Sequence, residues 1–130
     1  MPRFVILHHR TPPGAARGTH YDLMLEWGTT LRTWAIEQPP SLLPVQLAEQ
    51  LADHRVAYLD YEGPVSNNRG DVTRWDEGEY QLLTNDEPQL IVELHGRQLQ
   101  GTLKLSRPLP HDEKWQLLWI AKPTGESANR

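Results

Sequence analysis

Short runs of β-favouring residues, separated by turn residues, follow one another along most of this chain. This spacing is typical of an antiparallel all-β domain, either a barrel or a sandwich. The segment Trp27-Gly28-Thr29-Thr30 reads as a hairpin turn between two such runs. The expected strands are Phe4–His8, Tyr21–Trp27, Thr30–Ile36, Ala57–Tyr61, Gly70–Arg74, Gly78–Leu83, Leu90–Leu94, Gly101–Ser106 and Gln116–Ala121.

One segment, Pro44–Asp53, is expected to be helical. Proline suits the first turn of a helix, and Val45, Leu47 and Leu51 give a partial apolar stripe. By contrast, the two prolines and two glycines of Thr11–Gly18 indicate a loop. We therefore expect a mainly β fold, a compact closed or partly open β-barrel with one short helix.

The length and composition indicate a single domain. A chain of 130 residues is long enough for one core but not for two. We expect the domain to cover residues 3–122, followed by a disordered tail at 123–130. No apolar run approaches the ~18 residues of a membrane span, and the apolar start is too short for a signal peptide. The sequence therefore predicts a cytoplasmic protein with no membrane partner.

The charge is unevenly distributed along the chain. Four arginines against two acidic residues give residues 1–34 a charge of +2, whereas nine basic and fifteen acidic residues leave the remainder at −6. A basic region on an acidic body suits a small anionic target better than a long duplex. The chain also has no cysteine, so any metal must be held by His, Asp or Glu.

His20 and Asp22 lie two residues apart in an expected strand, and side chains at this spacing point to the same face. A histidine at the end of the first strand, His8 or His9, could join them. Two imidazoles and one carboxylate form an N,N,O set that suits manganese, iron or zinc. The alternative is that His20 and Asp22 form a polar strand edge that faces water.

His54 and Tyr58 follow in the middle of the chain. Both side chains can bind an oxyanion, and the imidazole can also protonate one. Each has a structural alternative. His54 could be a cation favoured by the end of the expected helix, and Tyr58 could be an aromatic residue of the barrel core.

Six segments of the chain, taken in order, resemble the 3′-phosphoesterase module of bacterial DNA ligase D and its stand-alone relatives. The resemblance covers roughly residues 4–122. The segments are Phe4-Val5-Ile6 with His9, His20-Tyr21-Asp22-Leu23 with Leu25-Glu26, Leu31–Ile36, Asp53-His54 with Tyr58–Gly63, Arg69–Val72 with Trp75–Tyr80, and Gly101–Leu105 with Trp115–Leu118.

This resemblance implies a compact β-barrel with a polar cleft. It implies an enzyme that removes 3′-phosphates and 3′-terminal ribonucleotides from DNA ends, with manganese as the preferred metal and zinc or other transition metals as alternatives. His9, His20 and Asp22 would be the metal ligands, so the register of the match favours His9 over His8. His54 and Tyr58 would contact the scissile phosphate.

Two departures from the family pattern bear on activity. Met24 stands where the family's signature has an arginine, and methionine supplies neither the charge nor the planar fork of a guanidinium. The loop after the first strand is also longer and brings Arg10 and Arg17. We expect Arg10, Arg17 or Arg32 to bind the phosphate, and Met24 to weaken catalysis.

The sequence therefore predicts a metal-dependent 3′-phosphoesterase acting on DNA or RNA-tipped DNA in end repair. The alternative is a catalytically impaired nucleic-acid-end or phosphate-binding module that retains the metal pocket. A structural barrel with no ligand would leave the clustered histidines unexplained. The expected partners are 3′ ends of nucleic acid and a DNA ligase or other end-joining proteins, and we expect a monomer.

Overall fold

The chain folds as a succession of antiparallel strands with one short helical turn. The structure is a computed structural model that describes residues 1–123. The only helix within those residues is the 3-10 helix η1 (Val56–Leu59), and none is long and apolar enough to cross a membrane. The strands are β1 (Arg3–Arg10), β2 (His20–Trp27), β3 (Thr30–Ile36), β4 (Val45–Arg55), β5 (Gly63–Pro64), β6 (Asp71–Asp86), β7 (Gln89–Gly96), β8 (Gln100–Ser106) and β9 (Lys114–Ala121).

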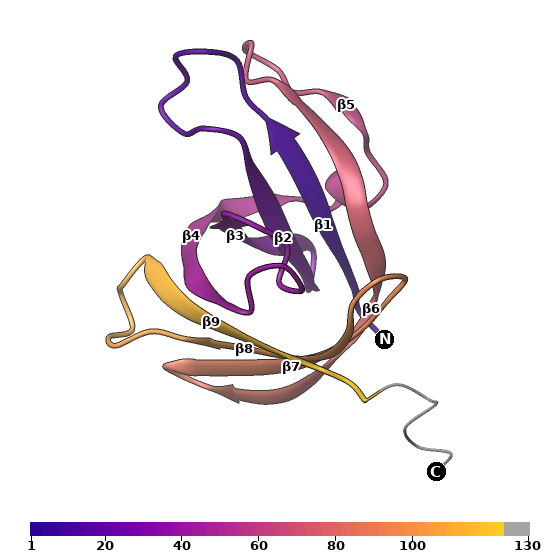
Figure 1. The fold of residues 1–130 in the computed structure, drawn as a ribbon, viewed down its shortest axis with the longest axis vertical. Coiled ribbons are helices and arrows are strands. Elements are labelled where there is room, and N and C mark those ends of the chain that lie inside the picture. Colours follow the sequence, from indigo (N-terminus) through magenta and orange to yellow (C-terminus); the bar gives the residue numbers. More distant parts are fainter. Residues whose placement is uncertain (124–130) are drawn as a thin grey trace.

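These strands form one sheet that closes on itself (Figure 1). The strand order is β1-β2-β3-β4-β9-β8-β7-β6-β5, and β1 also pairs with β6. That extra pairing closes eight of the nine strands into a barrel and leaves β5 on the edge of β6. The mainly β, barrel-like fold expected from the sequence is confirmed.

The helix expected at Pro44–Asp53 is wrong, because this segment is strand β4. Gln46 and Ala48 are buried, whereas Val45 and Leu47 are exposed, so the burial alternates with the period of a strand. The buried amide of Gln46 is satisfied by backbone groups of the preceding segment. The polar Gln46 faces inward, and the apolar Val45 and Leu47 face outward. The apolar residues of this segment therefore do not mark its buried face, and the expected helical stripe does not exist.

Two other differences concern boundaries. The strand expected at Ala57–Tyr61 is wrong, because most of this segment lies in η1. The strands expected at Gly70–Arg74 and Gly78–Leu83 belong to one long strand, β6, which begins one residue after Gly70. The predicted tail lies outside the described residues from residue 124 onward.

Strands β1 and β2 are covered on both of their faces. Phe4 and Leu23 belong to the core inside the barrel, where the rings of Trp34 and Trp115 meet edge to face at 5.6 Å. The opposite face carries a second apolar cluster on the outside of the barrel wall. Its buried members are Val5, Leu7, Met24, Leu31, Leu59, Val65 and Val72.

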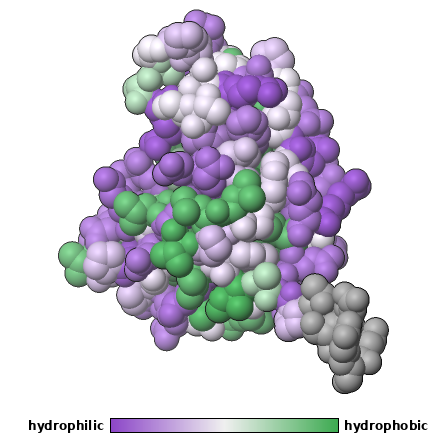
Figure 2. Space-filling view, in the orientation of Figure 1, coloured by the Kyte–Doolittle hydropathy of each residue, from purple (hydrophilic) through white to green (hydrophobic). Residues whose placement is uncertain are grey.

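The surface is unevenly polar. Hydrophobic surface gathers over the region where β4 and β9 lie side by side, and the part above it is mostly hydrophilic (Figure 2). The exposed apolar side chains of these two strands are Val45, Leu47, Leu118 and Ile120. The loops that follow β1 and precede β6 lie at the top of the same view (Figure 1).

Candidate metal centre

The three residues predicted to bind metal lie together on the outer face of the barrel wall. The β1–β2 ladder places His9 opposite His20, and Asp22 follows two residues later on the same face. One ligand atom from each residue lies within 4.8 Å of the other two. Asp22 and His20 are buried and His9 is half-buried. The strand geometry thus produces the grouping that the His-x-Asp spacing predicted.

Both imidazoles are oriented by backbone carbonyls. Nε2 of His9 donates a hydrogen bond to the carbonyl of Arg69 at 2.8 Å, and Nδ1 of His20 donates to the carbonyl of Gly18 at 2.7 Å. A carbonyl oxygen only accepts, so these nitrogens carry the proton. In the neutral rings, the lone pairs are therefore on Nδ1 of His9 and Nε2 of His20.

Those two lone pairs face the carboxylate of Asp22. Nδ1 of His9 lies 3.2 Å from Oδ2, and Nε2 of His20 lies 3.0 Å from Oδ1. Oδ1 is buried and receives no hydrogen bond from the described residues. Three acceptors therefore converge, and only a cation or a proton between them relieves their repulsion. This N,N,O set, with its carbonyl-oriented imidazoles, fits a divalent transition metal.

The electrostatics of the cluster agree with its geometry. Burial alone would raise the pKa of the Asp22 carboxyl, but hydrogen bonds and positive charge from His20 and His9, when these rings carry a second proton, outweigh burial and hold that pKa at about 2. The hydrogen-bonding contact with Asp22 in turn raises the pKa of His9. The carboxylate thus stays ionised across the whole range in which histidines titrate.

His8, the alternative to His9, points to the other face of β1. Its ring stacks on Tyr21 with the ring centroids 4.6 Å apart, and burial lowers its pKa. This arrangement follows from strand alternation and takes the His8 imidazole away from Asp22. His9 is therefore the histidine of the cluster.

His54 and Tyr58 line a cavity of about 300 Å³ that has His9 and Asp22 on its wall. The β3–β4 register is irregular just before His54, where β4 nears its end. Nδ1 of His54 donates to the carbonyl of Ala52 at 2.9 Å, which leaves Nε2 free of that contact. The His54 and Tyr58 rings meet edge to face at 5.7 Å.

A larger cavity of about 650 Å³ adjoins the same cluster. Its lining combines the metal-binding candidates and His54 with residues 11–17 of the long loop. The loop part of this lining includes Pro12, Pro13, Ala15 and Ala16 and is largely apolar. The cluster therefore contributes to the walls of two cavities of different polarity.

The three arginines predicted to bind phosphate have different positions. Arg10 pairs with Asp71 at 3.1 Å and lines neither of these cavities. Arg32 lies over the rings of Trp27 and Trp34, which pack with the core inside the barrel.

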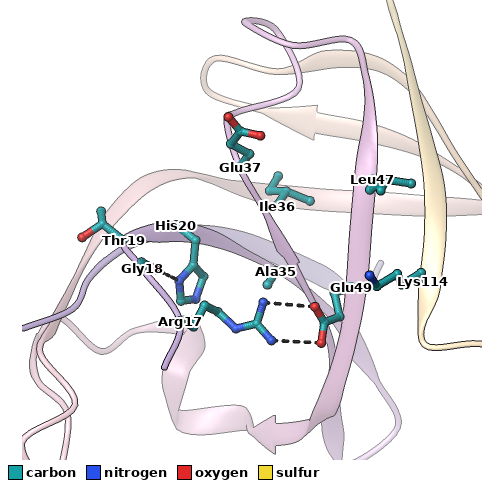
Figure 3. Close-up of a pocket in the computed structure, with 10 residues that line it drawn as sticks. All are labelled: Arg17, Gly18, Thr19, His20, Ala35, Ile36, Glu37, Leu47, Glu49 and Lys114. Carbon is teal, nitrogen blue, oxygen red and sulfur yellow. Dashed lines mark hydrogen bonds and ion pairs between the residues drawn. The ribbon is translucent and has the colours of Figure 1, made fainter. Parts of the chain in front are cut away.

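Arg17 lines the larger cavity, but Glu49 holds its guanidinium. Figure 3 shows both terminal nitrogens directed at the two carboxylate oxygens, at 3.3 and 3.0 Å. The same view shows His20 beside Arg17, with the ring of His20 hydrogen-bonded to Gly18. Arg17 therefore ties the long loop to β4.

Two arginines that the sequence interpretation overlooked lie on the cavity walls instead. Arg55 and Arg69 both line the 300 Å³ cavity with His9 and Asp22, and Arg69 also lines the larger one. The position of Arg55 next to His54 was the one available signal. Arg69 reaches the site through loop closure, which sequence spacing does not reveal.

Comparison with known proteins gives a consistent result. The family model of the DNA ligase D 3′-phosphoesterase domain matches residues 12–107. The chain is 33% identical over 120 residues to a multifunctional non-homologous end joining protein LigD of Pseudomonas aeruginosa, covering 83% of this chain and 14% of that protein. A LigD DNA repair protein of Mycobacterium tuberculosis is 32% identical over 121 residues, covering 86% and 15%. The chain thus spans less than a sixth of each relative.

Proposed function

Because the chain belongs to the DNA ligase D 3′-phosphoesterase domain family, we propose that it is a metal-dependent phosphoesterase acting on 3′ ends of DNA or RNA-tipped DNA. The reaction is the hydrolysis of a 3′-phosphate or the removal of a 3′-terminal ribonucleotide. The observation that supports this proposal best is the convergence of ligand atoms from His9, His20 and Asp22, which lie within 4.8 Å of one another beside a cavity.

His9, His20 and Asp22 would hold the ion, with Mn²⁺ proposed first and Zn²⁺ or another transition metal as alternatives. A bound divalent ion polarises a phosphoryl oxygen and offsets the charge that develops on it. The carbonyls of Arg69 and Gly18 fix the two imidazoles in the tautomers that ligation needs.

His54 and Tyr58 act on the phosphate from the wall of the smaller cavity. With Nδ1 of His54 bonded to Ala52, Nε2 is the atom that can meet the substrate. In its protonated form, this nitrogen donates to a phosphoryl oxygen or to the leaving oxygen. The Tyr58 hydroxyl makes no hydrogen bond to a residue within 1–123, so it is available to orient the phosphate.

We place this activity in DNA end repair, since the relatives are named for non-homologous end joining. A DNA ligase or other end-joining protein is the partner that this role implies. One observation favours a second candidate function, a binding module without turnover. Met24, which is 1% exposed, borders the cavity at the position where the family signature has arginine.

A turnover assay on a primer with a 3′-phosphate tests the proposal. We expect release of phosphate by the wild-type protein with Mn²⁺ and none with EDTA. His20→Ala should abolish turnover and weaken Mn²⁺ binding by more than ~100-fold, beyond the usual loss from removing an outer-shell partner. The matched control is His95→Ala, because His95 is exposed and its one ion pair within residues 1–123 is with Glu93.

The outcomes separate the two candidates. Metal binding and end binding without turnover would support the binding module. Turnover that survives both EDTA and His20→Ala would contradict the metal assignment.

A further inference from the structure

Nearly every arginine in residues 1–123 is engaged by a carboxylate or by aromatic rings. Arg32 lies over tryptophan rings. Within the described chain, only Arg55 and Arg69 have neither type of partner. The ion pairs are Arg3–Asp60, Arg10–Asp71, Arg17–Glu49, Arg74–Glu77, Arg97–Glu77 and Arg107–Glu87.

The two remaining arginines line the same cavity, together with His9 and Asp22. One comes from the end of β4 and the other from the loop before β6, segments with no ladder pairing between them. The carboxylates of Asp22 and Asp53 also line this cavity, but within residues 1–123 neither arginine forms an ion pair with them. Both guanidinium groups are exposed and can bind an anion together. Their convergence therefore indicates an anion site next to the metal cluster.

Arg69 is held in position by its own loop. Its guanidinium donates from Nε to the Ser66 carbonyl at 2.8 Å and from Nη2 to the Ser66 hydroxyl at 3.1 Å. Its remaining N–H groups, including both on Nη1, make no hydrogen bond to the described residues. Since the Arg69 carbonyl accepts from His9, one residue connects the anion site with a metal-ligand candidate.

Arg55 follows His54 directly and lies at the junction of β4 and η1. Its side chain is exposed and also lines a neighbouring cavity with Tyr58 and Tyr61. No hydrogen bond to a residue within 1–123 fixes its guanidinium. The guanidinium of Arg55 can therefore change its position to meet an incoming anion, whereas hydrogen bonds to Ser66 hold the guanidinium of Arg69 in place.

We propose that Arg55 and Arg69 are the phosphate-binding pair of this site, taking the phosphate of a 3′ end against the metal cluster. The assignment rests on the proposed function for the identity of the ligand. A guanidinium offers parallel donors that match two phosphoryl oxygens. The apolar Met24 beside this cavity supplies no charge, so the arginines of the wall provide it.

Titration of inorganic phosphate into the metal-free protein tests the pair directly. We expect the Nε–Hε NMR signals of Arg55 and Arg69 to shift first. Arg55→Gln and Arg69→Gln should each weaken phosphate binding about 10-fold, in the range of a lost charge-assisted hydrogen bond. The control Arg97→Gln removes the same charge from an exposed arginine outside the cavity and should change nothing.

Two further measurements separate this pair from the proposed enzyme activity. Mn²⁺ affinity should stay unchanged in Arg55→Gln and Arg69→Gln, while KM for a 3′-phosphorylated primer rises about 10-fold. Phosphate shifts at Arg55 and Arg69 in a protein without turnover would refute the enzyme but keep the pair. Turnover with an unaltered KM in both variants, or phosphate shifts of equal size at Arg97, would refute the pair and leave the enzyme standing.

Discussion

Nδ1 of His9 lies 3.2 Å from Oδ2 of Asp22, across two neighbouring strands of the barrel wall. A proton on that nitrogen and a metal ion at that oxygen compete for the same space. The contact raises the pKa of His9 above its usual 6.5. The position that suits a metal ion is therefore also one at which a proton binds more tightly than on a free histidine.

Metal affinity should fall as the pH is lowered, and the fall should begin above pH 6.5 because the pKa of His9 is raised. One competing proton weakens binding by ~10-fold per pH unit below that pKa. Asp22, with its pKa at about 2, stays ionised throughout. Isothermal titration with Mn²⁺ at several pH values measures this slope. An affinity that stays flat from pH 8 to pH 5.5 would remove histidine from the site.

The stability of the metal-free fold should depend on pH in the direction opposite to the metal affinity, and should be greater at low pH. A group whose pKa is raised by folding stabilises the fold below its unfolded pKa, and this contribution is lost as the pH rises through the folded pKa. The His9–Asp22 contact should thus stabilise the apo fold at pH 5–6 and do so less above neutrality. Thermal unfolding with EDTA checks the sign, and Mn²⁺ should reverse the trend above pH 7.

Gly70→Ala should destabilise the fold and weaken metal binding together. Gly70 has a φ of +94°, and a Cβ there would overlap the carbonyl oxygen of Arg10. We expect a loss of about 1–3 kcal/mol from the backbone strain, with a further loss from the overlap. The displaced backbone would also move the Arg69 carbonyl that orients His9.

The control for this change is Gly14→Ala. Gly14 has a φ of +81°, but a Cβ there meets no atom within 4 Å. This variant should lose only the left-handed penalty of about 1–2 kcal/mol and keep its Mn²⁺ affinity. Equal effects of the two variants on metal binding would show that the loop before β6 does not support His9.

Arg17→Gln and Glu49→Gln should each lower the stability of the fold by the same small amount. The pair is more than a third exposed on both sides, so it contributes at most ~1 kcal/mol to stability. Its role in the structure is to tie the long loop to β4, so either variant should increase proteolysis in residues 11–18 equally. If Arg17 itself bound the phosphate, Arg17→Gln alone would raise KM for the primer.

Met24→Arg should compensate for the loss of Arg55. Met24 belongs to the outer apolar cluster yet borders the cavity, so an arginine there can extend its guanidinium to the phosphate while its stem stays packed. We expect turnover to rise at least ~10-fold in an Arg55→Gln background, consistent with a regained charge-assisted contact. The rise in the wild type should be smaller, because Arg55 and Arg69 already supply charge.

Met24→Arg should also affect the stability of the fold, and this effect needs a control. Burial of part of a guanidinium stem and charge at Met24 should lower stability by about 1–3 kcal/mol. Met24→Gln, measured in the same assays, adds polarity without charge and should lower stability without restoring turnover. A Met24→Arg protein that folds but restores nothing would place position 24 out of reach of the phosphate.

The grouping of His9, His20 and Asp22 could be predicted from the sequence because it depends on local geometry. The spacing of His20 and Asp22 fixes their common face once the segment is a strand, and a strand-end histidine on the paired strand completes the set. The choice between His8 and His9 also follows from alternation. The only contact between separate segments that this prediction needs is the antiparallel pairing of β1 with β2.

Other parts of the structure depend on contacts that the sequence does not encode locally. β4 was predicted to be helical because Val45 and Leu47 are apolar, although both face solvent and the polar Gln46 is buried. Its backbone hydrogen bonds go to β3 and β9, which are known only from the closed sheet. Arg55 and Arg69 meet at one cavity for the same reason, since chain closure brings β4 and the loop before β6 together.

The two covered faces of β1 and β2 constrain how this protein can change. Inward positions pack in the barrel core, and outward positions carry His9, His20 and Asp22 beside the second apolar cluster, so a shift of one residue in register would exchange the two faces along both strands. New specificity is then accessible only by single exchanges at outward positions, or through the surrounding loops. Position 24, on the outward face, and position 55, at the end of β4, both line the smaller cavity, so exchanges at either position would alter this cavity without touching the interior of the barrel.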